Sequence, residues 1–167
     1  MRSLLLALLL CSVALSAAAQ NVLFAGNLAR ANVPAGYEHY FEERRKTLVL
    51  APTGKLKAEV RFTFNSLREY LSQKPNAGLD FIEYAASKKN RPLFDIPENG
   101  GKAFIDFARD GVLNGKKAQD THGMMGLRNG YVTFTITIDQ EHVDSEAAKE
   151  LLGTGIKALL GRIRSEA

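Results

Sequence analysis

The sequence predicts an α+β fold in which an antiparallel sheet carries packed helices within a single domain. Three observations lead to this prediction. Several stretches alternate apolar and polar residues, Gly- and Pro-containing turns join them, and apolar residues recur at helical spacing in the middle and at the end of the chain. The order strands, helices, strands, helix is typical of an α+β protein. No repeat or Pro/Ser-rich linker interrupts residues 20–167, so we expect one domain there.

The strands of the first half follow a leading segment, residues 20–35, whose apolar residues 22–24 we expect to dock on the core. Alternation over Tyr37–Ala51 predicts one or two strands, and Pro52-Thr53-Gly54 predicts a turn. In the next strand three apolar residues face one way, namely Val60, Phe62 and Phe64. The residues between them, Arg61 and Thr63, face the other way.

Three helices are expected. Ser66 and Glu69 have the spacing of a capping box, and this first helix should stop at Lys74–Gly78. Leu79–Asn90 predicts a second helix, with a strand over its first half as the weaker alternative. Ser145 should cap a closing helix that extends to Arg164. Its buried stripe is expected to contain Ala148, Leu151, Leu152, Ile156, Leu159, Leu160 and Ile163.

The region between the second and third helices predicts antiparallel strands. Leu93–Ile96 and Lys102–Arg109 should pair, with Ala103, Ile105 and Phe107 on one face of the second strand. Lys116–Met125 should pair with a strand whose outward residues are Tyr131, Thr133, Thr135 and Thr137. Turns are expected at Pro97–Gly101, Asp110-Gly111, Asn114-Gly115 and Arg128–Gly130.

The first nineteen residues have the layout of a cleavable Sec signal peptide. Arg2 precedes an apolar run from Leu4 to Leu15, and Ala17-Ala18-Ala19 provides the small residues that signal peptidase requires. We therefore expect cleavage before Gln20 and a periplasmic or secreted protein, with a retained anchor as the alternative. The run is shorter than the ~20 residues of a membrane span, so no integral membrane segment is expected after cleavage.

The single cysteine, Cys11, lies inside the apolar run of this signal. Leucines precede it where a lipoprotein signal needs a small residue, so we do not expect lipidation. Its removal with the signal would leave a mature protein without disulfides, stabilised by an ordinary apolar core.

The net charge of +4 is spread along the chain. Carboxylates are interspersed among the basic groups, and no concentrated basic face with stacking aromatics is evident, so we expect no nucleic-acid partner. Weak attraction to anionic lipid heads or to an acidic protein stays open. The basic groups are Arg44-Arg45-Lys46, Lys55 and Lys57, Lys88-Lys89 with Arg91, Lys116-Lys117, and Arg162 with Arg164.

The element order resembles the Mog1/PsbP-like fold, which the photosystem PsbP proteins share with several small exported bacterial proteins. The segments that carry the resemblance are Val33–Tyr37 opening a strand, the central helical segment, the late hairpins, and the closing helix Ser145–Arg164. The resemblance lies in layout, and no functional residue transfers by position. In size and expected export the chain is also similar to small immunity proteins that protect bacteria from periplasmic toxins.

Catalytic and metal-binding motifs are weak. The sequence has no G-x-S-x-G elbow, no cysteine beyond the signal and no phosphate-binding glycine fingerprint, and we expect no cofactor. His122 with Met124 and Met125 is a soft donor set that suits Cu(I), although adjacent methionines on a strand point to opposite faces. Asp139–Asp144, which contains His142, could serve a hard cation or form a polar connection to the closing helix.

The sequence therefore favours a non-enzymatic exported protein that binds a protein partner or a ligand, in an immunity or accessory role. The expected contact surface is the outward sheet face with the adjacent glycine-rich loops around Gly100-Gly101 and His122–Gly126. Its named members are Tyr131, Thr133, Thr135, His122, Met124 and Met125. The alternative is a copper-handling protein or a small periplasmic hydrolase that uses His122 or His142.

Overall fold

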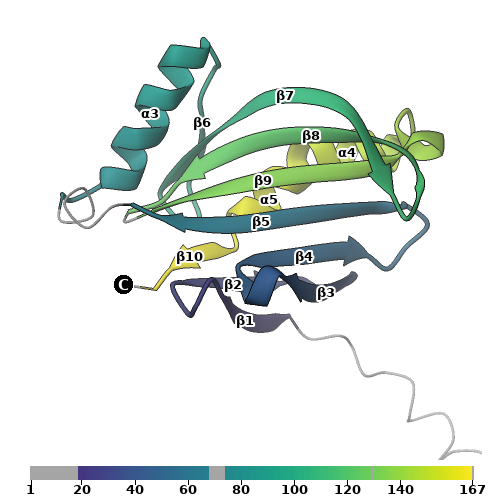
Figure 1. Ribbon diagram of the computed structural model, residues 1–167, viewed down its shortest axis with the longest axis horizontal. Helices are drawn as coiled ribbons and strands as arrows, with labels where there is room; N and C mark the ends of the chain where they lie inside the picture. The colour runs from purple at the N-terminus through teal and green to yellow at the C-terminus, as the bar shows by residue number, and fades with distance from the viewer. Residues whose placement is uncertain (1–18, 68–73, 129, 167) are drawn as a thin grey trace, which may run out of the picture.

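The computed structural model describes residues 19–67, 74–128 and 130–166, and within them the chain forms two antiparallel sheets (Figure 1). The larger sheet has seven strands, in the spatial order β3 (Tyr37–Glu42), β4 (Thr47–Pro52), β5 (Ala58–Ser66), β9 (Gly130–Asp139), β8 (Lys116–Gly126), β7 (Gly101–Leu113) and β6 (Phe94–Ile96). The smaller sheet has three, in the order β1 (Gln20–Phe24), β2 (Ala29–Val33) and β10 (Ile163–Ser165).

The helices lie on opposite sides of the larger sheet. The helix α3 (Ala77–Lys89) covers one end of one face, which we call the outer face. The C-terminal helix packs with the small sheet against the other, inner face, and Figure 1 shows it behind the long strands. It consists of α4 (Glu146–Glu150), the π-helical η3 (Leu151–Gly155) and α5 (Ile156–Leu160). The 3₁₀ turns are η1 (Glu43–Arg45) and η2 (Gln140–His142).

The main core lies between the inner face, the C-terminal helix and the small sheet. Phe62 and Phe134 from the centre of the sheet are fully buried there, as are Ile156 and Leu160 from the helix. Each such side chain contributes about 1.5–3 kcal/mol through its removal from water. A second, smaller cluster lies under α3 on the outer face, around Ile82, Ala86 and Phe104.

These features confirm the α+β class, and several elements match their predicted positions. The faces of β5 and β9 alternate as expected, with Val60, Phe62 and Phe64 buried. The stretch 37–51 forms two strands, and Asn114-Gly115 forms the expected turn with positive φ at both residues. Ser145 caps the closing helix by accepting a hydrogen bond from the Ala148 amide at 3.2 Å.

The leading segment forms a hairpin of β1 and β2, and its Val22 and Phe24 dock on the main core as expected, whereas Leu23 is exposed. Two expectations about the later elements were wrong. Asp110-Gly111 is not a turn, because β7 continues through it to Leu113. The closing helix ends at Leu160, and Ile163 instead enters β10, which pairs with β2. The small sheet combines the two ends of the chain, a long-range pairing that local patterns do not encode.

A bulge in β7 overturns the expected position of Phe107. The register pairs Ile105 with Gly123 and Phe107 with His122, leaving Asp106 as the extra residue. Such a bulge shifts the alternation by one residue. Ala103 and Ile105 therefore pack on the main core, while Phe107 lies on the outer face and is 42% exposed.

The helix α3 begins inside the stretch that was expected to stop a helix. Its first turn holds Ala77 and Gly78, and the predicted second helix is otherwise confirmed. The first predicted helix is not tested: Ser66 ends β5, and Glu69 with its neighbours falls outside the described residues. Gly78 is required by close packing, because a Cβ there would collide with the carbonyl oxygens of Leu127 and Gly130.

Candidate functional site

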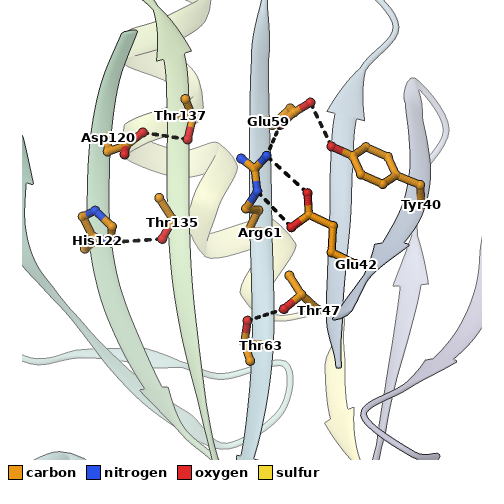
Figure 2. A network of polar contacts seen from close by, with 10 residues as sticks. All are labelled: Tyr40, Glu42, Thr47, Glu59, Arg61, Thr63, Asp120, His122, Thr135 and Thr137. Atoms are coloured by element: carbon orange, nitrogen blue, oxygen red, sulfur yellow. Dashed lines mark hydrogen bonds and ion pairs between the residues drawn. The ribbon is translucent and has the colours of Figure 1, made fainter. Parts of the chain in front are cut away.

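The outer face carries a continuous set of polar side chains beyond the part that α3 covers (Figure 2). Alternate residues of β3, β4, β5, β9 and β8 supply them, because successive side chains of a strand point to opposite faces. Figure 2 shows the C-terminal helix passing behind the sheet, on the side away from these residues. The drawn set is Tyr40, Glu42, Thr47, Glu59, Arg61, Thr63, Asp120, His122, Thr135 and Thr137.

The strand register arranges part of this face as a straight cross-strand row. Each residue of the row is the pairing partner of the next, so the row crosses six strands from β7 to β3. Its members are Phe107, His122, Thr135, Arg61, Val49 and Tyr40. Directly opposed residues on one face of an antiparallel pair are close enough to interact, so the row is connected from β7 to β3, with Val49 buried within it.

His122 is held in this row by two contacts. Its Nδ1 lies 3.0 Å from the Thr135 hydroxyl, and its ring stacks on Phe107 with 4.5 Å between ring centroids. The other ring nitrogen, Nε2, is buried and has no hydrogen-bond partner among the described residues. Burial, with the positive charge of Arg109, lowers the pKa of His122, and the carboxylates of Asp120 and Asp106 only partly oppose this.

Asp120 lies beside His122 on the same strand face. It accepts a hydrogen bond from the Thr137 hydroxyl at 2.7 Å, and the Arg109 Nε is 4.0 Å from its second oxygen. Gly111 leaves room for this carboxylate, because a Cβ at that position would overlap it. The glycine that suggested a turn in the sequence thus serves side-chain packing across two strands.

Arg61 is the charged centre of the face. Its guanidinium donates to both carboxylate oxygens of Glu42, at 3.4 and 3.5 Å. The Arg61 Nη2 also lies 2.6 Å from Glu59, although the angle leaves that buried Glu59 oxygen without a well-directed hydrogen bond. Burial disfavours the charge of Arg61, but Glu59 and Glu42 outweigh it and raise the pKa of Arg61.

Tyr40 completes the network at the β3 edge. Its hydroxyl donates to the second Glu59 oxygen at 3.0 Å. Partial burial and this hydrogen bond to Glu59 raise the pKa of Tyr40 to about 12. The ring is 41% exposed, so Tyr40 has a fixed hydroxyl and an accessible apolar surface.

The structure places most of the predicted contact residues on this face. Thr133, Thr135 and His122 are partly exposed there, and Thr137 is on the same face but buried by its bond to Asp120. Tyr131 is partly covered, because its ring packs against Phe81 of α3 with 4.6 Å between centroids. Met124 packs in the cluster under α3.

Met125 has to be removed from the predicted surface. It is fully buried in the main core on the inner face. The adjacent methionines therefore point to opposite faces, as strand geometry requires. They do not form a joint thioether pair beside His122.

Sequence reasoning missed Tyr40, Glu59 and Phe107 as members of the candidate surface. Alternation had already placed Arg61 on the outward side of its strand, but it gave no pairing register, so its partners were not evident. The position of Phe107 depended on the bulge. The Glu38–Glu42 region offered the one usable signal, a tyrosine flanked by acidic residues in a strand pattern.

Within residues 19–67, 74–128 and 130–166, no group of three or more His, Cys, Asp and Glu side chains is arranged to hold a metal ion. His142 lies in η2, where Asp139 Oδ1 accepts a hydrogen bond from the Glu141 amide at 3.0 Å. Over the same ranges, no helix combines the length and the apolar character needed to span a bilayer.

Comparison with known proteins shows the fold alone. No protein-family model matches the chain, and no curated protein matches it. A crystal structure from Bacteroides thetaiotaomicron VPI-5482 aligns with 90% of this chain at a TM-score of 0.61 and 11% identity. The alignment covers 49% of that protein, so this chain spans about half its length.

The layout resemblance to PsbP is also found. The solution structure of cyanobacterial PsbP (CyanoP) from Synechocystis sp. PCC 6803 aligns with 93% of this chain and 96% of its own, at 10% identity and a TM-score of 0.38. A likeness at this level concerns layout and carries no argument about activity.

Proposed function

We propose that this chain is an exported, non-enzymatic protein that binds a protein partner across the outer face of its large sheet. One observation carries the proposal. Two aromatic side chains, Phe107 and Tyr40, are each about two-fifths exposed at the two ends of the fixed cross-strand row. Exposed apolar rings beside polar groups are typical of contact surfaces.

The composition of the row supports a protein rather than a small molecule as occupant. Tyrosine and arginine are enriched among residues that dominate protein–protein binding energy, and Arg61 and Tyr40 both contact Glu59 here. Their hydrogen bonds already fix their rotamers, so less conformational entropy is lost on binding. The charges are mixed, with two arginines among three carboxylates, which favours a partner whose surface also has both signs.

The competing function, copper handling or hydrolysis through His122 or His142, has less support. The Nδ1 of His122 is engaged by Thr135, and Met125, one of the two expected thioether ligands, is in the core on the other face. An immunity or accessory role is compatible with the proposed binding function and is part of the same proposal.

The export part of the proposal rests on the signal layout of residues 1–19. The first strand begins at Gln20, so cleavage after Ala19 would leave the small sheet complete. Mass spectrometry of the protein from the periplasm should find Gln20 as the N-terminal residue. An Ala19→Arg variant should stay uncleaved, because signal peptidase needs a small residue at that position.

The binding part can be tested by quantitative affinity isolation from periplasmic extract. The bait would be the purified protein, compared with a variant that carries both Tyr40→Ala and Phe107→Ala. We expect one specific partner whose retention falls at least tenfold with the double variant, a loss in the range found for central interface aromatics. Val112→Ala is the matched control, since Val112 is 69% exposed near the tip of the β7–β8 hairpin and should retain the partner.

Two outcomes would contradict the proposal. One is equal retention by the wild type and the double variant, with both shown to be folded by circular dichroism. The other is stoichiometric copper in the purified protein, together with a function lost on His122→Ala or His142→Ala.

A further inference from the structure

A second candidate site lies away from the outer face, where the small sheet meets the end of α5. A cavity of about 510 Å³ opens there, within the size range of small-molecule sites. Figure 1 shows β10 running beside β2 at this end of the molecule. The polar groups that line the cavity are Asn21, Arg30, Asn32, Glu98, Arg162 and Arg164.

The strand pairing brings like charges together at this cavity. Arg30 of β2 and Arg164 of β10 are directly opposed residues of an antiparallel pair. Opposed side chains project to the same face, and like charges in this position are unfavourable. Arg162 adds a third guanidinium group two residues before Arg164. An anion placed between these groups would relieve their mutual repulsion.

Neutral groups fix two of these arginines without neutralising them. Arg162 donates from Nη1 to the Asn32 side chain at 2.7 Å, and Asn32 in turn donates to Asn21 at 3.1 Å. Arg164 donates to the backbone carbonyls of Glu98, at 2.7 Å, and of Gly161 and Ile163. These bonds orient the guanidinium groups, but a carbonyl or amide oxygen carries no full charge.

Within residues 19–67, 74–128 and 130–166, the carboxylates near the cavity are fewer than the arginines. Glu166 pairs with Arg30 at 2.8 Å, with side chains 32% and 47% exposed, so water screens this pair strongly. Glu98 also lines the cavity, with its carboxylate toward Gly161. Among these described residues, three guanidinium groups face two carboxylates, and the positive charge is in excess.

We propose that this cavity binds a small molecule through an oxyanion group, a phosphate or a carboxylate. Guanidinium groups present paired N–H donors that match the oxygens of both groups. The asparagines supply further neutral hydrogen-bonding groups for the rest of the ligand. This inference is independent of the proposed partner surface on the outer face.

The test is a titration of the purified full-length mature protein, at low ionic strength, with inorganic phosphate, pyrophosphate and citrate. Isothermal calorimetry should show saturable binding of at least one of them. Arg162→Gln should weaken this binding about tenfold or more, the loss expected for a hydrogen bond to a charged group. Arg30→Gln provides a second variant, because the Arg30 side chain pairs with Glu166 in a contact that water screens.

The control variant is Arg91→Gln, which removes the same charge outside the cavity. Arg91 lies 3.8 Å from Asp106, which Lys89 also holds at 2.6 Å, so its loss should leave both folding and anion binding unchanged. Circular dichroism of each variant checks that the fold is retained.

A second arm identifies the source of the oxyanion. The protein could cosediment with phosphatidylglycerol vesicles, less so with Arg162→Gln, and bind none of the soluble anions. That result would assign a lipid headgroup. Binding of soluble anions alone would assign a free solute. The inference is overturned if neither arm shows binding, or if Arg91→Gln weakens binding as much as Arg162→Gln does.

Discussion

Arg61 combines partial burial with two carboxylate partners, and this makes it the residue on which the outer face most depends. Its side chain is 30% exposed, and that of Glu59 is 13% exposed. An ion pair at this depth is screened less than a surface pair, and losing one member leaves the other desolvated without compensation. The network thus stabilises the fold and holds Tyr40 in position at the same time.

Replacing Arg61 with methionine, which keeps much of the aliphatic stem, should lower the free energy of unfolding by about 1–2 kcal/mol. Urea denaturation would measure this change. Lys149→Met is the matched control, because the Lys149–Glu146 pair has side chains 60% and 90% exposed and should contribute less than about 0.5 kcal/mol. Equal losses for the two variants would show that the Arg61 network is no stronger than a surface pair.

His122 should make stability depend on pH in the mildly acidic range. Its pKa in the folded state is lowered by burial and by Arg109, whereas in the unfolded chain it takes its ordinary value of about 6.5. Below that pH the unfolded state binds a proton that the folded state does not, so the free energy of unfolding falls as the pH decreases. Above it both states are neutral and the contribution of His122 to stability is fully present.

Denaturation at about pH 7 and about pH 5 checks this prediction. The wild type should lose more stability between these values than His122→Gln does. His39→Gln, which removes a histidine of β3 outside the stack, is the control for the loss of an imidazole as such. If His122→Gln loses as much stability between the two pH values as the wild type does, other groups cause the pH dependence.

At the scale of elements, two glycines allow α3 to dock on the sheet. A Cβ at Gly78 would collide with backbone of the β8–β9 connection, and a Cβ at Gly126 would lie 2.5 Å from the Gly78 carbonyl oxygen. Backbone therefore packs on backbone at this end of the helix. This contact sets how much of the outer face α3 covers, including Tyr131 and Met124.

Gly78→Ala should destabilise the protein by about 2 kcal/mol or more, because rigid backbone atoms cannot move aside as a side chain can. Gly153→Ala is an informative control: nothing lies within 4 Å of its Cβ position in the C-terminal helix. It should be neutral or stabilising by up to about 1 kcal/mol, since alanine favours helix. Thermal denaturation of both variants tests these two expectations. An unchanged stability in Gly78→Ala would contradict the close backbone packing of α3 on the sheet.

The bulge at Asp106 is a second feature of a single element that shapes the outer face. It leaves the Asp106 carboxylate to be held by Lys89 from the end of α3, at 2.6 Å. It also turns Phe107 and Arg109 onto the outer face beside His122. One extra residue in a strand thus creates one end of the proposed partner surface.

At the scale of the whole molecule, Asn99 connects segments that are far apart in sequence. Its Nδ2 donates to the carbonyls of Leu160 and Ile163, both at 2.9 Å, and its Oδ1 accepts from the Gly101 amide at 2.9 Å. The turn between β6 and β7 is thereby tied to the end of the C-terminal helix and the start of β10. This tie links the large sheet to the small one.

Asn99→Ala should lower the free energy of unfolding by about 1–3 kcal/mol, because it removes three hydrogen bonds to backbone groups that are partly buried. Hydrogen exchange should also become faster in β10 and β2, which this tie anchors. Asn21→Ala, which removes one exposed hydrogen bond to Asn32, should change stability by no more than about 0.5 kcal/mol. If hydrogen exchange in β10 is unchanged in Asn99→Ala, the Asn99 hydrogen bonds do not stabilise the small sheet.

Much of the secondary structure could be predicted because its signals are local. The alternation over Val60–Phe64 and Val132–Ile138 identified the two central strands and both of their faces. Ser145 identified the start of the closing helix, and Asn114-Gly115 identified the position of the turn between β7 and β8. Helical and strand periods arise from backbone geometry, so a short stretch of sequence is enough to reveal them.

The sequence by itself therefore determined the α+β class, the central strands β5 and β9, the helix α3 and the start of the closing helix, and which side chains of the central strands face away from the core. Only the tertiary structure decided that Arg61 meets Glu42 and Glu59, that Phe107 faces outward, and that Arg30 lies opposite Arg164. Register, bulges and the pairing of distant chain ends depend on many contacts between remote residues. No local pattern encodes those contacts, and the two proposed binding surfaces are built from them.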